Sequence, residues 1–260
     1  MLRHRLSVAA GVLLLLSPLV PASTAVAAHD AISAAVSDPA RPDSDTRQDE
    51  NRKPVQVLEF SQVKPGDRVV DLIPGGGYMT RLFSKVVGSG GHVYAMVPTE
   101  LLSMRKTADM AVKDMAASSH YRNVTVLRQS VQAFSPPEPV DLVWTSMNYH
   151  DLHDSFFGPA DLSKVNKAVF DALKPGGIYL VMDHAAAPGS GLRDTETLHR
   201  IDPEAVKREV TAAGFVLEAD SDLLHNPADD HTLKVFDPAV RGKTDKFMFR
   251  FRKPMRSEAR

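Results

Sequence analysis

The chain contains no cysteine among its 260 residues. It therefore forms no disulfide and offers no thiolate, which excludes zinc-thiolate sites, iron–sulfur clusters and cysteine nucleophiles. Neither sign of charge is in excess, because the chain has 31 Lys and Arg and 32 Asp and Glu, for a formal net charge of -1. A nearly neutral protein has no general electrostatic attraction for a phosphate backbone, so we expect no nucleic-acid partner.

Long apolar runs are also absent after residue 20. The run at residues 6–20 follows Arg3 and Arg5, and the small residues Ala25-Val26-Ala27 come after it. This order is typical of a secretory signal peptide, and the run is shorter than the roughly 20 residues that a spanning helix needs. We predict a signal peptide at 1–27, a periplasmic or secreted protein, and no stable membrane insertion. An uncleaved membrane anchor is the alternative.

The composition divides the remaining chain into three parts. Residues 28–52 are rich in Asp, Ser, Arg and Pro and poor in large apolar side chains, which predicts a flexible linker. Residues 53–254 have the length of one domain, and a hydrophobic content of 43% is enough for one core. Residues 255–260 are expected to form a disordered tail.

Apolar patterns of strand and helix type alternate along residues 53–254. Strands are predicted at 68–72, 92–97, 123–127, 140–144, 178–182, 215–219 and 247–251, and helices at 79–87, 101–117, 161–173 and 203–213. Such alternation predicts an α/β fold: a Rossmann-like, seven-stranded, mostly parallel sheet with helices on both faces. Ligands of such sheets bind at the edge where the parallel strands end.

A glycine-rich segment, Asp71-Leu-Ile-Pro74-Gly75-Gly76-Gly77, joins the first predicted strand to the first helix. Glycines at this position let a ligand approach the backbone closely. The segment resembles the Asp-x-Gly-x-Gly-x-Gly loop of class I S-adenosylmethionine-dependent methyltransferases, with Ile73 in place of the first glycine. A second similarity is Leu173-Lys-Pro-Gly-Gly177, which resembles the turn that precedes the family's fifth strand.

This resemblance implies a methyltransferase that uses S-adenosylmethionine. The cofactor would lie against Pro74 and the backbone of Gly75, Gly76 and Gly77, and Asp71 would orient its amino group. Tyr78 would stack on the ligand or cover the first helix. Glu100 stands in for the acidic residue that holds the ribose hydroxyls in the family, and Ser130 stands near the place of the adenine-binding Asp.

Three further segments narrow the resemblance. These are Pro74–Tyr78, Asn148-Tyr-His150-Asp151-Leu-His153, and Asp183-His184 followed by residues 198–202. Together they resemble an exported bacterial group known as predicted methyltransferases.

Histidines and carboxylates follow the fourth and fifth predicted strands, which adjacent parallel strands bring to one edge of the sheet. In a catalytic interpretation, His150 or His184 is the general base, Asp151 or Asp183 orients its ring, and Asn148 contacts the acceptor. In a structural interpretation these side chains stabilise loops. A third interpretation is a divalent metal held by some of His150, His153, His184, His199, Asp151 and Asp183.

Two functions follow from these features. The first is methyl transfer from S-adenosylmethionine to an unidentified small-molecule acceptor. The alternative is an exported protein that keeps the methyltransferase fold with a different cofactor, either as a metal-dependent enzyme or as a ligand-binding protein. The sequence leaves the oligomeric state open.

Overall fold

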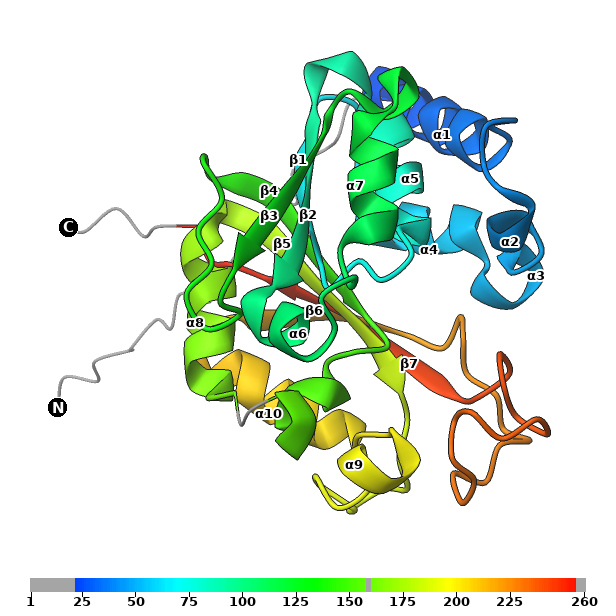
Figure 1. Ribbon diagram of the computed structural model, residues 1–260, viewed down its shortest axis with the longest axis vertical. Coiled ribbons are helices and arrows are strands. Elements are labelled where there is room, and N and C mark those ends of the chain that lie inside the picture. The colour runs from blue at the N-terminus through cyan, green and yellow to red at the C-terminus, as the bar shows by residue number, and fades with distance from the viewer. Residues whose placement is uncertain (1–21, 158–159, 256–260) are drawn as a thin grey trace, which may run out of the picture.

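The computed structural model describes residues 22–157 and 160–255 (Figure 1). Its strands are β1 Arg68–Leu72, β2 His92–Pro98, β3 Val124–Gln129, β4 Val140–Ser146, β5 Leu173–His184, β6 Val216–Ser221 and β7 Lys246–Arg252. Its α-helices are α1 Ala22–Val36, α2 Asp43–Thr46, α3 Asp49–Arg52, α4 Pro54–Ser61, α5 Tyr78–Val87, α6 Thr99–Met104, α7 Met110–Ala117, α8 Leu162–Ala172, α9 Thr195–Leu198 and α10 Pro203–Ala212.

The strands form one seven-stranded sheet in the order β3-β2-β1-β4-β5-β7-β6. Strands β1 to β5 are parallel to their neighbours, and β7 runs antiparallel to both β5 and β6. The predicted mostly parallel, Rossmann-like sheet is confirmed. Because β1 and β4 are adjacent and parallel, the glycine loop and the segment after Ser146 leave the same edge of the sheet.

Helices cover both faces of the sheet (Figure 1). On one face, α1, α4, α5 and α7 pack over a core that includes Leu58, Phe83 and Trp144. On the other face, α8 and α10 pack over a second core that includes Val169 and Val206. This two-layer burial explains why the strand sequences are apolar on both sides.

The helix boundaries follow local signals in the sequence. The side chains of Asp161 and Asp202 accept backbone N–H bonds at the starts of α8 and α10, and Pro203 occupies the first turn of α10. The predicted helix at 101–117 is instead two helices, α6 and α7. It breaks because Arg105 is extended and the carboxylate of Asp109 accepts a bond from Arg128 of β3.

The segment Lys174–Gly177, expected as a turn, is part of β5. In the pairing of β5 with β4, Leu173 lies opposite Val140 and Ile178 lies opposite Leu142. The register therefore shifts between these two pairs. Gly176 takes a φ of 77° there and accepts a bond from Arg252 of β7. The glycines therefore form a bulge inside a strand rather than a turn before it.

Residues 28–52 are not the flexible linker that we predicted. They continue α1 and form α2 and α3, and Ile32 and Ala35 are buried in the same core as α5. Polar contacts replace the missing large apolar side chains, since Arg41, 5% exposed, pairs with Asp49 at 2.6 Å. The helix α1 also runs through the predicted cleavage position after Ala27.

Two predicted segments fall at the ends of the chain. Most of the signal peptide, residues 1–21, and residues 256–260 of the tail lie outside the described residues. Within residues 22–157 and 160–255, no helix has the length and apolar character needed to cross a membrane.

Candidate functional site

The glycine loop makes a tight turn at the end of β1. Ile73, Gly75 and Gly77 have φ values of 60°, 55° and 81°, and the Ile73 N–H donates to the carbonyl of Met96 on β2. A positive φ strains a β-branched residue such as Ile73, so the loop stores strain of a kind that is common at functional sites.

Asp71, the last acidic residue before the loop, is 2% exposed. The Thr80 hydroxyl of α5 donates to its Oδ2 at 2.6 Å. Burial raises the pKa of Asp71 to about 7, although the bonds from Thr80 act in the opposite direction. Close to neutral pH, this carboxyl group therefore exchanges between its neutral and charged forms.

A cavity of about 440 Å³ opens beside the loop. Its walls are Asp71 with residues 73–76 and Tyr78, the end of β4 at Trp144 and residues 146–148, and the N-terminal residues Ser44, Asp45, Gln48 and Arg52. This volume lies within the range of about 300–1,000 Å³ of small-molecule sites. Among the predicted cofactor residues, Asp71, Pro74, Gly75, Gly76 and Tyr78 line the cavity.

Gly77, Glu100 and Ser130 do not line this cavity. A Cβ on Gly77 would lie 2.3 Å from the Met115 methyl group, so this glycine serves helix packing. Ser130 donates to Glu100 at 2.6 Å, and the Val131 N–H donates to the same carboxylate. Glu100 thus joins α6 to the segment after β3.

The N-terminal wall was missed by sequence reasoning. Tyr78 donates from its hydroxyl to Asp49 at 2.6 Å, and the Arg52 guanidinium lies 4.4 Å from the centre of the Tyr78 ring. Burial lowers the pKa of Arg52, and the nearby Asp45 and Asp49 only partly offset this effect. The wall therefore places a partly buried cation at the cavity.

Asn148 connects the two strand ends beneath the cavity. Its side-chain N–H donates to the Ile73 carbonyl at 3.0 Å, and its carbonyl accepts a bond from the Thr145 hydroxyl. Met147, just before it, has a φ of 56°. Asn148 thus holds the glycine loop against β4, and its side chain lines the cavity.

The structure brings His150, Asp151 and Asp183 together. His150 is 3% exposed, and its Nδ1 lies 2.8 Å from Asp183 Oδ1 while its Nε2 lies 3.2 Å from Asp151 Oδ1. Burial alone would lower the pKa of His150, but the two carboxylates raise it to about 10. These side chains do not line the cavity of about 440 Å³.

The other three predicted histidines have different partners. His184 Nδ1 lies 2.7 Å from the Thr244 hydroxyl, and burial lowers the pKa of His184 to about 3. His153 Nε2 lies 3.2 Å from Glu209 of α10, so it faces away from the cluster. His199 Nδ1 lies 3.6 Å from Asp151 Oδ1 and so joins His150.

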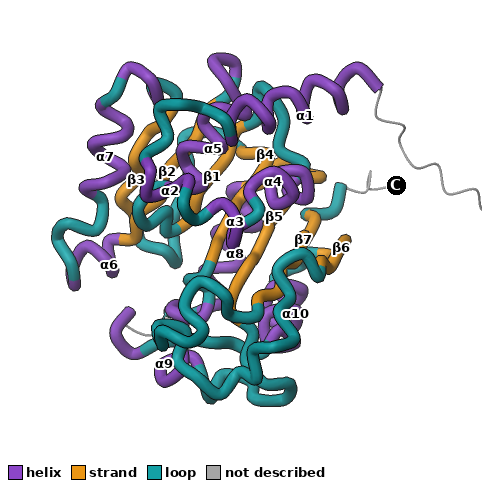
Figure 2. Tube along the Cα trace, turned by 90° about the vertical axis from the view of Figure 1, so that its right-hand side faces the viewer, coloured by secondary structure: helices purple, strands orange, loops and turns teal. Residues whose placement is uncertain are grey.

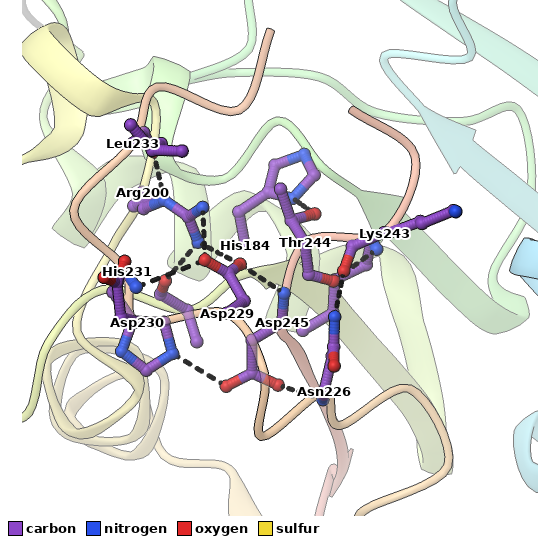
Figure 3. A network of polar contacts seen from close by, with 12 residues as sticks. His184, Arg200, Asn226, Asp229, Asp230, His231, Leu233, Lys243, Thr244 and Asp245 are labelled. Carbon is purple, nitrogen blue, oxygen red and sulfur yellow. Dashed lines mark hydrogen bonds and ion pairs between the residues drawn. The ribbon is translucent and has the colours of Figure 1, made fainter. Parts of the chain in front are cut away.

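The long loop between β6 and β7 lies at the same end of the sheet as α9 (Figure 2). Figure 3 shows how it is fastened: Arg200, fully buried, contacts Asp229 at 2.9 Å and donates to the carbonyls of Ala185 and Leu233. This network fixes residues 199–201 beside the end of β5.

A larger cavity of about 670 Å³ lies between residues 132–139 and α8. It adjoins the start of β4 at Val140, which is the edge opposite the glycine loop. Because ligands of parallel sheets bind where the strands end, we place the candidate site at the smaller cavity.

Comparisons with known proteins find relatives among methyltransferases. No protein-family model matches the chain. It is 29% identical over 149 residues to the ubiquinone/menaquinone biosynthesis C-methyltransferase UbiE of Photorhabdus laumondii, covering 55% of this chain and 54% of that protein. The UbiE protein of Vibrio vulnificus is 26% identical over 182 residues, with 68% and 65% covered. The chain thus spans about half to two thirds of the length of these relatives.

Solved structures share the fold. A SAM-dependent methyltransferase from Aquifex aeolicus aligns with a TM-score of 0.55 and 18% identity, over 79% of this chain and 98% of that chain. The cyclase SpnF aligns with a TM-score of 0.56 and 15% identity, over 79% and 82%. Since a protein named as a cyclase has the same fold, the fold by itself does not define the reaction.

Proposed function

We propose that this chain, which has the fold of class I S-adenosylmethionine-dependent methyltransferases, transfers a methyl group from that cofactor to a small-molecule acceptor. The observation that carries the proposal is the cavity at the glycine loop, which combines a buried carboxyl group, backbone that a ligand can approach closely and a partly buried cation. The alignment with C-methyltransferases over 149 residues supports the same reaction.

The residues of the cavity fit the amino-acid part of S-adenosylmethionine. That part carries an ammonium and a carboxylate, and the cavity offers Asp71 for the first and Arg52 for the second. An ammonium next to Asp71 favours the charged form of this carboxyl group, which burial otherwise disfavours. The backbone at Gly75 and Gly76 leaves room for the ligand, since a Cβ at either position would meet no atom within 4 Å.

When bound, the cofactor supplies an activated methyl group, so the protein mainly needs to position the acceptor. Asn148 is proposed as a positioning residue, because it fixes the glycine loop against β4 and lines the cavity. The role of His150 or His184 as the base, and that of Asp151 or Asp183 in orienting its ring, stay predictions.

Calorimetric titration of the full chain with S-adenosylmethionine tests the proposal. We expect one cofactor per chain, and we expect Arg52→Gln to weaken binding at least tenfold because a charge-assisted contact is lost. The exposed Arg47 lies in the same N-terminal segment outside the cavity, so Arg47→Gln is the matched control. Absence of binding to the wild type contradicts the proposal, and equal affinities of the two variants contradict the role of Arg52.

We also propose that the protein is exported, because residues 1–27 contain basic residues, then an apolar run and then small residues, which is the order of a signal peptide. Mass spectrometry of the N-terminus of the natively produced protein tests this. A chain that begins near Ala28 in the extracytoplasmic fraction supports export, and an intact chain that remains in the cytosol contradicts it.

A further inference from the structure

Three potential metal ligands meet above the end of β4. They are His150 Nε2, Asp151 Oδ1 and His199 Nδ1, and all three atoms lie within 4.8 Å of one another. Asp151 Oδ1 is 3.2 Å from the first nitrogen and 3.6 Å from the second. In a tetrahedral zinc site with bonds of about 2.0–2.1 Å, neighbouring ligand atoms are about 3.3 Å apart. Two of the three distances between donor atoms are therefore already close to those of a coordination shell.

The opposite nitrogen of His150 is held in the way that metal-binding histidines are held. His150 Nδ1 lies 2.8 Å from the fully buried Asp183, whose other oxygen accepts the His150 backbone N–H. A carboxylate that accepts from Nδ1 fixes the ring, so that Nε2 can bind an ion in exchange for its proton. The Asp183 contact thus orients Nε2 toward Asp151.

His199 reaches the cluster by means of a strained backbone. Its φ of 55° is unusual for a residue other than glycine. Two residues further on, Ile201 is fixed beside β5, since its N–H donates to the carbonyl of His184 and its carbonyl accepts from the Ala186 N–H. Strain maintained by such a network is characteristic of binding sites.

A buried carboxyl group lies next to the cluster. Asp154 is 0% exposed, and its side chain interacts with Thr195. It lies within electrostatic reach of His150, Asp151 and His199. The carboxyl groups of Asp151, Asp154 and Asp183 thus lie around His150, where a bound cation would interact favourably with them.

We infer that His150, Asp151 and His199 bind a divalent transition-metal ion, with Asp154 as an additional nearby carboxylate. Two imidazoles and one carboxylate suit zinc, manganese or iron(II). The ion would tie the segment after β4 to the residue that follows α9. This inference goes beyond the proposed methyl transfer and does not depend on it.

Zinc titration of the full chain, produced without a histidine tag and freed of metal by chelation and dialysis, tests the inference. We expect one Zn²⁺ per chain, at least tenfold weaker binding in Asp151→Asn and His199→Asn, and a higher melting temperature of the wild type with zinc. Asparagine tolerates a positive φ, so His199→Asn removes the imidazole without new backbone strain. His29→Ala, which changes a histidine with a side chain 61% exposed on α1, is the control.

Two outcomes overturn the inference: wild-type protein that binds no zinc, and Asp151→Asn that binds it as tightly as the wild type. If either variant fails to fold, Co²⁺ bound to the wild type gives an independent measurement. Visible absorption typical of a nitrogen and oxygen site supports the inference, and the spectrum of hydrated Co²⁺ contradicts it.

Discussion

Asp71→Asn is expected to change how the stability of the fold depends on pH. Burial raises the pKa of Asp71 from its ordinary value of 3.8 to about 7. Asparagine has the same shape, and its amide oxygen accepts the bond that Thr80 donates to Asp71. The substitution therefore removes the titration while it keeps the local structure.

The sign and size of the effect follow from linkage. Below pH 3.8 the folded and unfolded chains both keep the Asp71 proton, and between pH 3.8 and about 7 the unfolded chain releases it first. The free energy of unfolding of the wild type thus falls as pH rises through this window. A difference of about 3 pKa units corresponds to at most about 4 kcal/mol, at about 1.4 kcal/mol per unit.

Urea unfolding of both proteins at several pH values from 4 to 8 measures this difference. The stability of Asp71→Asn relative to the wild type should increase with pH up to about pH 7 and then remain constant. Subtracting the two curves cancels every other titrating group. A relative stability that does not change between pH 4 and 8 refutes the reasoning, because the carboxyl group would then titrate alike in both states.

Two further substitutions test the packing around the site. Gly77→Ala should destabilise the fold by about 1–2 kcal/mol, since Gly77 has a φ of 81° and the Met115 methyl group must move. Gly76→Ala is the control, because a Cβ at that position meets no atom within 4 Å. Equal unfolding free energies of the two variants would contradict this explanation. Arg200→Met should cost about 3–5 kcal/mol because it leaves the buried Asp229 unpaired. The side chain of Arg193, which pairs with Asp194, is 68% exposed, so Arg193→Met should cost at most about 1 kcal/mol. A lower melting temperature for Arg193→Met than for Arg200→Met would count against the network of Figure 3.

The sheet was predictable because its signals are local. For example, β1 is a short apolar run that ends at the glycine loop, and α10 begins at its capping residue Asp202. The break between α6 and α7 was not predictable, since it depends on the contact of Asp109 with Arg128, 19 residues away.

The candidate site was predictable only to the level of a shared edge. Alternation predicts parallel strands that end at one edge of the sheet, so Asp71, Gly75 and Asn148 were expected at that edge, and all three line the cavity. The partners of individual histidines could not be predicted, because they depend on the conformations of the loops. His184 contacts Thr244, and His153 contacts Glu209. Composition offers no signal for such distant pairs.

The N-terminal segment shows why low hydrophobicity misled the prediction for residues 28–52. Besides the buried Ile32 and Ala35, these residues pack on the domain through charge and aromatic contacts: Asp45 with Arg81, Asp49 with Arg41, and Tyr78 with both Asp49 and Arg52. These contacts involve the cavity wall, because Asp45, Arg52, Tyr78 and Arg81 all line the cavity. Arg81 also donates to the Gly76 carbonyl of the glycine loop at 2.8 Å. The polar composition that suggested a tether therefore serves to build the wall of a polar pocket, which a purely apolar helix could not supply.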